Sequence, residues 1–367
     1  MEKIKITNHQ LGALTAIATA GTGIIIISGN MAKFAKQDAW IAAIAGILLG
    51  AAVIAVHIYL GSLHPDKTYL EIFRYAFGKW IGNLFILAFL FLCFIAVTHI
   101  SHFMAAFMVL QYLEETPYYA IDLLIVIVYV IALQYGIGTI VRSSESFVYL
   151  ISFLFLLSMG LVFPNIKVDN LLPVLEEGIK PVIAASLYLI SYIAFPNIVI
   201  GALYPNMKPM KGAGKAMLIG YFVGSLSIFT VVIMSMLVLG SSIVGRVPFP
   251  TYLLAKEINV GEVLTRLEGV VAGIWAITLF YKALLYFYNL VIGTSILFGL
   301  KEPKKIVLPY ALLILILMNI VLPDAFIEEK FNTVAWPYFI GTFGGVMPII
   351  LIIITKIKRS KSTKTNN

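Results

Sequence analysis

The stretch "ATAGTGIIIISG", from Ala18 to Gly29, decides how this sequence folds. It lies inside an apolar run that is long enough to cross a lipid bilayer, for which a helix needs about 20 residues. Each glycine costs an α-helix about 1 kcal/mol relative to alanine, so Gly21 and Gly23 are unfavourable at this depth. Two interpretations are open. The glycines either let neighbouring helices pack closely or mark a break that exposes backbone N–H and C=O groups.

The composition of the chain is that of an integral membrane protein. Of its 367 residues, 60% are hydrophobic and 12% are charged, whereas soluble domains carry about 25% charged residues. The mean hydropathy is +0.97. The polar start MEKIKITNHQ leads directly into the first apolar run, so we expect a spanning helix there and no cleavable signal peptide. Cys93 is the only cysteine, which excludes an intrachain disulfide and a cysteine-rich metal site.

Ten apolar segments are long enough to span, and they predict an all-α integral membrane protein. They are residues 10–30, 38–60, 81–111, 118–137, 143–163, 181–203, 212–240, 267–297, 305–322 and 335–356. If the N-terminus is cytoplasmic, the inner segments hold 17 of the 26 lysine and arginine residues and the outer segments hold eight. This asymmetry explains the net charge of +8 without a nucleic-acid partner. Both termini, including the basic tail 357–367, are therefore expected in the cytoplasm.

The ten spans divide into two sets of five within a single transmembrane domain, about 10–163 and about 181–356. The first span of the second set contains "SYIAFPN" (191–197), with Pro196 near its middle. Proline removes one backbone hydrogen bond and clashes with the preceding turn. Interrupted helices at matching positions of two halves indicate an inverted-repeat transporter fold and locate its binding site. We therefore favour a break in the first helix of each half.

The residues around the first break resemble a known superfamily. "AGTGIIII" (20–27) is similar to the glycine-rich break of the amino acid–polyamine–organocation superfamily. Three further stretches resemble the B subunits of spore germinant receptors: "NLLPVLEEGIKPV" (170–182), "FPTYLLAKEINVGEVLTRLEGVVAGIW" (249–275) and "LFYKALLYFYNL" (279–290). After its proline the second break continues Asn-Ile-Val, where the resemblance leads us to expect a Phe-Gly-Glu-like sequence.

The resemblance covers the whole chain and implies a LeuT-like fold. It also implies a receptor subunit of the spore inner membrane that senses a nutrient, expected to be an amino acid, and triggers germination together with A and C subunits. A proton-coupled amino-acid permease is the main alternative, because it would have the same fold and a similar site. Uptake of a labelled amino acid would distinguish the two functions.

The expected ligand site lies at mid-membrane between the two breaks. The second half of the first helix would begin near residue 23, where its free N–H groups and positive dipole end favour a ligand carboxylate. No Asp or Glu lies near the middle of a predicted span, so a ligand ammonium would meet carbonyls and hydroxyls. For the aromatic residues, packing against lipid or core remains an alternative. The expected ligand-binding residues are Thr19, Ala20, Gly21, Thr22, Gly23, Ser191, Tyr192, Phe195 and Asn197.

Lys282 lies about midway along the eighth span. A charged side chain at the bilayer centre costs at least about 2.5 kcal/mol, so a specific interaction is expected to compensate for the burial of Lys282. It either makes a polar contact between helices or, as the LeuT-like resemblance implies, replaces a bound sodium ion as a fixed cation. In the second case we expect carbonyls near Thr19, Ala20 and Gly23 to hold it.

His99 and His102 are three residues apart and lie on one face of a helix. They form either a packed neutral pair or a polar, proton-handling contact, and no cysteine or nearby carboxylate supports a metal site. No catalytic constellation or cofactor motif is evident, so we expect neither an enzyme nor a cofactor. The outer loops 168–180 and 241–266 are amphipathic. They either lie at the membrane interface, cover the ligand entrance or dock a partner.

Overall fold

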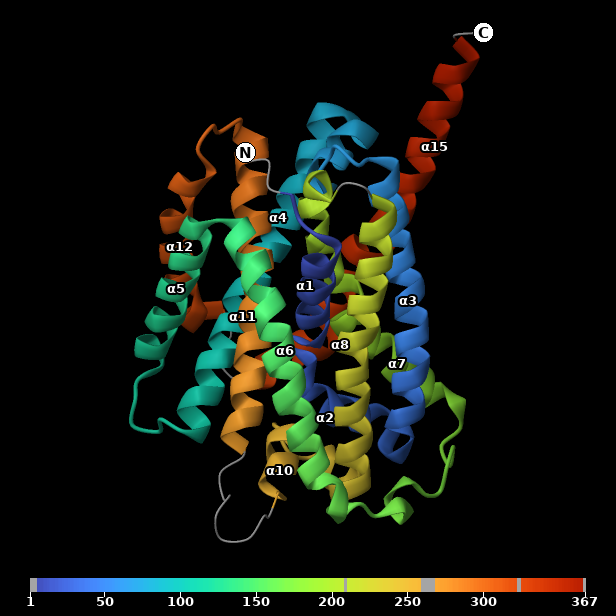
Figure 1. Cartoon of the computed structure of the whole chain (residues 1–367), viewed down its shortest axis with the longest axis vertical. Helices are drawn as coiled ribbons and strands as arrows, with labels where there is room; N and C mark the ends of the chain where they lie inside the picture. Colours follow the sequence, from blue (N-terminus) through green and yellow to red (C-terminus); the bar gives the residue numbers. More distant parts are fainter. Residues whose placement is uncertain (1–4, 208–209, 259–267, 322–324, 366–367) are drawn as a thin grey trace.

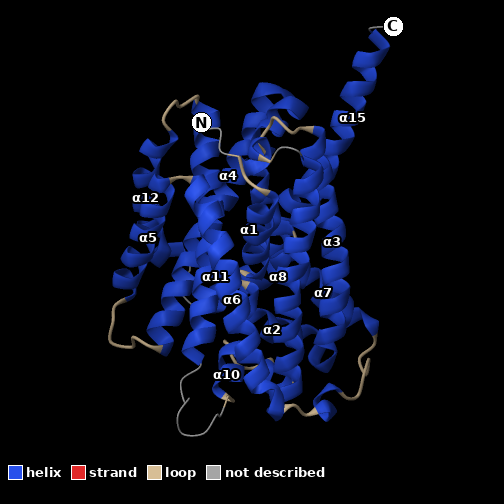
Figure 2. Ribbon diagram, viewed as in Figure 1, coloured by secondary structure: helices blue, strands red, loops and turns tan. Residues whose placement is uncertain are grey.

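The structure, a computed structural model, describes residues 5–207, 210–258, 268–321 and 325–365. Within these ranges the chain forms helices joined by loops and no β-strand (Figure 2). The N-terminal end of α1 (Asn8–Ala20) and the C-terminal end of α15 (Met347–Thr365) lie at the same end of the bundle (Figure 1). Eight of the described helices are long and apolar enough to cross a membrane. The chain is therefore a multi-pass membrane protein.

The N-terminal helix consists of two pieces, α1 and α2 (Gly23–Ala35), with two residues between them. α1 begins at a capping box, in which Thr7 and Gln10 each accept a hydrogen bond from the backbone N–H of the other. α1 and α2 have 13 residues each, so neither alone reaches the roughly 20 residues of a span. Of the ten expected spans, the ninth corresponds to α12 (Val307–Val321), which has only 15 residues; residue 322 lies outside the described ranges.

Except at the starts of α4 and α6, the remaining long helices follow the predicted spans within a few residues. They are α3 (Ala39–Leu63), α4 (Tyr69–Gln111), α5 (Tyr118–Tyr135), α6 (Ile137–Val162), α7 (Ile179–Ile193) with η4 (Phe195–Asn206), α8 (Met210–Leu239) and α11 (Glu268–Phe298). α4 begins 12 residues before its predicted start and is divided at Gly78, which has a φ of +79°. Its first part carries Glu71 and Arg74, and therefore has no apolar signal of a membrane span.

The last helix line contains two π-helical turns. It runs through α13 (Ala325–Lys330), η6 (Phe331–Ala335), α14 (Trp336–Gly341), η7 (Thr342–Val346) and α15. Each π turn lies directly before a helix whose second residue is proline, Pro337 or Pro348. Proline has no N–H for the carbonyl four residues earlier and clashes with it, and a π turn widens the helix at that point. The carbonyl that Pro348 leaves free, that of Gly344, accepts a hydrogen bond from His57 Nε2 at 2.6 Å.

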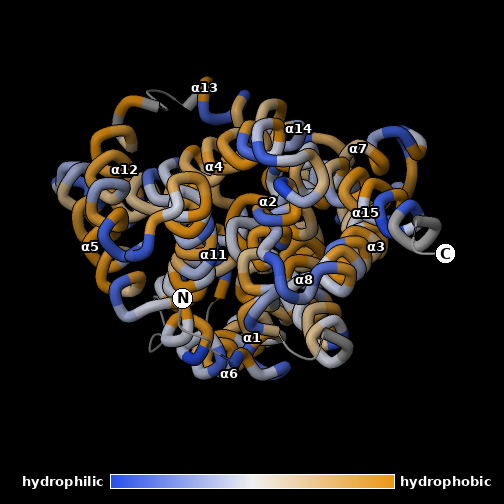
Figure 3. The backbone as a smooth tube through the Cα atoms, turned by 90° about the horizontal axis from the view of Figure 1, so that it is seen from above, coloured by the Kyte–Doolittle hydropathy of each residue, from blue (hydrophilic) through white to orange (hydrophobic). Residues whose placement is uncertain are grey.

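Two of the candidate spans lie deepest in the bundle. In the most apolar windows of α7–η4 and of α11, 78% and 72% of the residues are buried, compared with at most 50% in the other candidate spans. Outer helices such as α5 and α12 expose large apolar side chains, among them Leu124 and Ile316. Seen from above, hydrophobic residues lie on these outer helices as well as at the centre (Figure 3). This distribution places the outer apolar surface against lipid.

The segment 168–180 is held against the start of α3 by polar contacts. Gln37 Nε2 donates to the carbonyl of Pro173 at 2.7 Å, and the N–H of Leu175 donates to Asp38 Oδ1 at 2.9 Å. The second long loop contains α9 (Ser241–Val244) and α10 (Pro250–Lys256), and α10 packs against α2, α8 and α11. The rest of that loop, residues 259–266, lies outside the described ranges. The described parts of both loops therefore contact the helices around α2.

Candidate ligand site at two helix junctions

The junction between α7 and η4 leaves a buried carbonyl without its helical partner. Pro196 has no N–H to donate to the carbonyl of Tyr192, four residues earlier. That carbonyl instead accepts a hydrogen bond from Lys282 Nζ of α11 at 2.8 Å. The same Nζ donates to Thr22 Oγ1, between α1 and α2, at 3.0 Å. The Lys282 side chain, which is 1% exposed, therefore connects both helix junctions.

Two other carbonyls at the end of α7 are also satisfied by side chains. The carbonyl of Ser191 accepts from Trp336 Nε1 of α14 at 3.2 Å. The carbonyl of Ile193 accepts from Asn197 Nδ2 at 2.7 Å, and the same amide nitrogen donates to Thr19 Oγ1 of α1 at 3.1 Å. These contacts meet the requirement that buried carbonyls at a helix end find donors. They also pair Thr19 with Asn197, so these two expected site residues satisfy each other.

A small cavity, called the lysine cavity below, lies beside the Lys282 ammonium. Its volume is about 20 Å³, which is room for about one water molecule. Six residues whose side chains carry a polar N–H or O–H group or a carbonyl line it: Thr22, His99, Tyr192, Lys282, Asn332 and Trp336. Its apolar wall is formed by Ile26, Ala96, Ile100 and Phe103. The cavity therefore combines α2, α4, α7, α11 and the last helix line.

The π turn η6 contributes Asn332 to this cavity. The Tyr192 hydroxyl donates to the backbone carbonyl of Asn332 at 3.0 Å, and His99 Nε2 is hydrogen-bonded to Asn332 Oδ1 at 2.9 Å. The sequence did not predict these two lining residues. Asn332 lies before the predicted last span, which begins at residue 335, and Trp336 lies within that span without a local feature that marks it as a site residue. The signal that could have indicated them is Pro337, which lies near the start of an apolar helix and predicts a distorted turn in the residues before it.

The Lys282 ammonium has partners other than those that the sequence predicted. Its hydrogen bonds go to a hydroxyl and to a carbonyl of α7, instead of the carbonyls of Thr19, Ala20 and Gly23. Gly21 nevertheless lies against the lysine stem, since an added Cβ there would be 2.6 Å from Lys282 Cδ. An added Cβ at Gly23 would be 2.6 Å from Ile228 Cδ1 of α8. Close packing is therefore a role of both glycines, whatever else they do.

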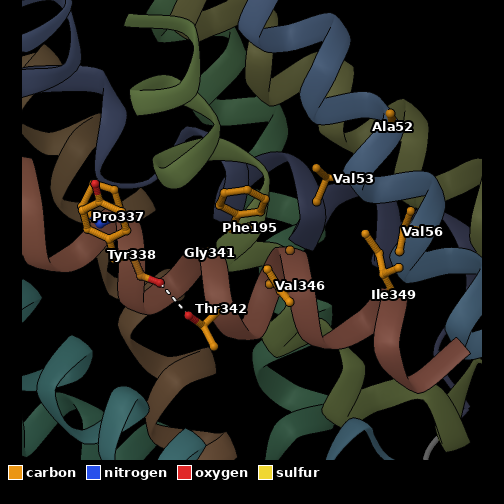
Figure 4. Close-up of a pocket in the computed structure, with 12 residues that line it drawn as sticks. Ala52, Val53, Val56, Phe195, Pro337, Tyr338, Gly341, Thr342, Val346 and Ile349 are labelled. Carbon is orange, nitrogen blue, oxygen red and sulfur yellow. Dashed lines mark hydrogen bonds between the residues drawn. The ribbon is translucent and has the colours of Figure 1, made fainter. Parts of the chain in front are cut away.

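Phe195 lies apart from the lysine cavity. Its ring packs against Gly341 and Gly345 of the last helix line, since an added Cβ at these glycines would be 3.5 and 2.9 Å from ring carbons. Figure 4 shows Phe195 between this helix and Val53 of α3, in an apolar groove of about 580 Å³. The expected site residues are thus divided. Thr22 and Tyr192 line the lysine cavity, whereas Phe195 lines a different pocket.

The two histidines are separated as well. His99 lines the lysine cavity, and its Nδ1 has no hydrogen-bond partner among the described residues. His102 lies on the side of α4 that faces α5, where its Nδ1 is 4.0 Å from Asp122 Oδ2. His99 is therefore the one of the pair that can contact a ligand in this cavity.

Polar contacts between α2 and its neighbours lie on the side of the cavity away from α1. Asn30 Nδ2 of α2 donates to the Tyr188 hydroxyl of α7 at 2.7 Å. Lys33, one turn further along α2, forms an ion pair with Glu329 of α13. Together with the cavity itself, these contacts connect α2 to α7 and to the last helix line.

Comparison with known proteins identifies the family. The family profile described as "Spore germination protein" matches residues 5–325. This chain belongs to the spore germination protein family. Spore germination protein KB of Bacillus subtilis (strain 168) is 28% identical to this family member over 373 residues, which cover 100% of this chain and 98% of that protein. Spore germination protein A2 of the same organism is 25% identical and covers 98% of both chains.

Solved structures of LeuT-fold transporters resemble this family member. Mhp1, a nucleobase-cation-symport-1 family transporter in a closed conformation with bromovinylhydantoin bound, matches with a TM-score of 0.68 at 14% identity. The match covers 94% of this chain and 78% of Mhp1. MhsT in complex with L-phenylalanine matches with a TM-score of 0.62 at 13% identity, covering 96% of this chain and 98% of MhsT. At these identities the likeness shows the fold alone.

Proposed function

We propose that this chain is the nutrient-sensing subunit of a spore germinant receptor. The nutrient, an amino acid, binds between the junction of α1 with α2 and the junction of α7 with η4. The observation that carries the proposal is the Lys282 ammonium, which joins both junctions beside a closed cavity. A ligand entering this cavity must change these contacts, and the resulting movement of α2 and α7 is the signal that triggers germination. The family membership supports this role.

The same proposal treats the two junctions as breaks within membrane spans. α1 with α2 then forms the first span, α7 with η4 the sixth and α12 the ninth, which makes ten spans in two inverted sets of five. An even number of spans requires both termini on one side, and the described ends of α1 and α15 lie at a common end (Figure 1). The positive-inside rule makes that side the cytoplasm. The membrane is the spore inner membrane, and the partners are the A and C subunits.

Electrostatics of the α1–α2 junction favour a carboxylate. The first N–H groups of α2 have no partners within the helix, and its N-terminus is the positive end of the helix dipole. Thr22, the residue before α2, adds a hydroxyl that already contacts Lys282. In this arrangement Lys282 acts as the fixed cation between α11 and the junctions. His99, which also lines the cavity, offers a second polar contact.

A proton-coupled amino-acid permease is the second candidate, because solved structures of this fold are transporters. The two functions are separated by flux. Vesicles that contain this chain alone are incubated with labelled amino acids at a pH gradient, and spores lacking the chain are tested for germination on the same compounds. A receptor subunit gives no accumulation and a loss of germination that the intact gene restores. If the labelled amino acid accumulates in response to the pH gradient and spores lacking the chain germinate normally, the chain is a permease and the receptor function is refuted.

A further inference from the structure

The charge of the lysine cavity is unbalanced. Among the ten residues that line it, the basic side chains are those of Lys282 and His99, and none is an Asp or Glu. A buried ammonium without a nearby carboxylate lacks the partner that would normally compensate for its desolvation. The α7 end helps, because the carbonyl of Tyr192 lies at the negative end of a helix dipole. The full negative charge that would balance the lysine is not supplied by the lining residues.

The ammonium also has an unused donor. A lysine ammonium carries three N–H bonds and accepts none. Two of them point to Thr22 Oγ1 and to the Tyr192 carbonyl, and the described residues supply no acceptor for the third. Since Lys282 is 1% exposed and lines the cavity, that donor can be satisfied only from within the cavity.

We propose that Lys282 itself recognises the nutrient, by donating its third N–H to a carboxylate, and that the nutrient class is therefore small carboxylic acids. This inference rests on the proposed function and goes beyond it, because the amino group of the nutrient becomes secondary. An ammonium in the cavity would meet only neutral acceptors such as Asn332, and it would lie near another cation. A 2-hydroxy acid should therefore act in place of the matching amino acid, whereas an amide should not.

The dimensions of the cavity restrict the rest of the nutrient. Its volume of about 20 Å³ is room for about one water molecule, so a whole amino acid does not fit without displacing the lining. The remainder must displace part of the wall, which is apolar where α2 and α4 contribute Ile26, Ile100 and Phe103. A small aliphatic side chain meets this wall at the least cost.

The test uses spores whose receptor contains this chain and its own partners. Dose curves are measured for matched compounds, namely L-alanine, L-lactate, L-alaninamide and ethylamine, and for the same four types built on valine and phenylalanine, with glucose and inosine as unrelated nutrients. We expect that only compounds with a carboxylate give a germination response that depends on this chain. Each acid should be at least about tenfold more potent than its amide, because the free energy of a hydrogen bond to a charged group corresponds to at least this ratio. A chain-dependent response to an amide, amine, sugar or nucleoside at the potency of the acids would overturn the carboxylate inference and leave the receptor function standing. If no compound requires the chain, the receptor function fails as well.

Lys282→Met distinguishes recognition from a structural role. Methionine keeps much of the length and removes the charge, and we expect the potency of the acid to fall about ten- to hundredfold while the preference for acid over amide disappears. A purely structural lysine would lower the potencies of acid and amide by the same factor and preserve their ratio, which would refute the proposal. Lys305→Met is the matched control, since Lys305 is 75% exposed and pairs with Glu302; it should leave the ratio unchanged. Immunoblots of the spore membrane confirm equal amounts of the variants.

Discussion

Gly21→Ala tests whether the α1–α2 junction and Lys282 form one packed unit. An alanine Cβ at this position would lie 2.6 Å from Lys282 Cδ, 3.4 Å from Lys282 Cβ and 3.1 Å from the carbonyl of Ala18. Contacts of 2.6 Å do not persist, so the lysine stem must move while its ammonium is held by two hydrogen bonds. Overpacking of this kind costs about 1–3 kcal/mol. This cost lowers the equilibrium population of the native packing of Gly21 against Lys282, relative to conformations in which the two are separated, by about 5- to 150-fold.

The assay is thermal unfolding of the purified protein in detergent, followed by nutrient dose curves of spores carrying the variant. We expect a lower melting temperature and an altered dose curve at normal protein level. Gly273→Ala is the matched control, because it lies on the same helix as Lys282 and an added Cβ there meets nothing within 4 Å. It should be neutral or stabilising by up to about 1 kcal/mol, through helix propensity.

A double-mutant cycle makes the reasoning refutable. Lys282→Ala removes Cδ, so the cost of Gly21→Ala should fall by at least about 1 kcal/mol in that background. An equal cost with and without the lysine stem would show that the collision with Lys282 is not what limits this position. The effect would then have to come from the backbone or from the carbonyl of Ala18.

Three further predictions follow from contacts around the site. Tyr192→Phe removes the hydroxyl that donates to Asn332, and this variant should change which nutrient is most potent. Phe195→Leu alters a separate groove and should lower only the melting temperature. Unchanged nutrient preferences in the Tyr192→Phe variant would argue against the site. His57→Leu leaves a carbonyl of the second π turn unsatisfied and should destabilise the protein by about 1–3 kcal/mol in detergent unfolding, so an unchanged midpoint would contradict the role of that bond. Asp38→Ala removes the carboxylate that accepts from the Leu175 N–H in the loop 168–180, so limited proteolysis should cut this loop faster than in the native protein. If the A and C subunits slow cleavage of the native loop, docking there is supported. Equal cleavage rates with and without these subunits would exclude docking at this loop.

Much of the architecture could be predicted from the sequence, because the bilayer imposes simple local rules. A span must be apolar over about 20 residues and must satisfy its own backbone groups, and both properties are local in sequence. Most helices therefore begin and end within a few residues of the predicted bounds, whereas α4 and α6 begin earlier and the last helix line extends beyond its predicted span at both ends. Gly21, Gly23 and Pro196 predict interruptions within two spans. α1 ends at Ala20 and η4 begins at Phe195, and the interpretation of these junctions as breaks within spans belongs to the proposed function. The early start of α4 was missed, since that part is amphipathic and does not need to be apolar.

Only the tertiary structure decided which side chains meet at the site. Lys282 is separated in sequence from Thr22 by 260 residues and from Tyr192 by 90 residues, and no local rule relates them. The sequence alone shows Lys282 as a costly charge and Pro196 as a residue that interrupts a helix. Because α11 packs against both junctions, the Tyr192 carbonyl that Pro196 leaves without a backbone donor accepts a hydrogen bond from Lys282. The packing around α4 likewise separates His99, which lines the cavity, from His102, which lies near Asp122 of α5, because two residues on one helix face can contact different neighbours. Helix formation depends on nearby residues, whereas the chemistry of this cavity depends on how five helices are placed around it.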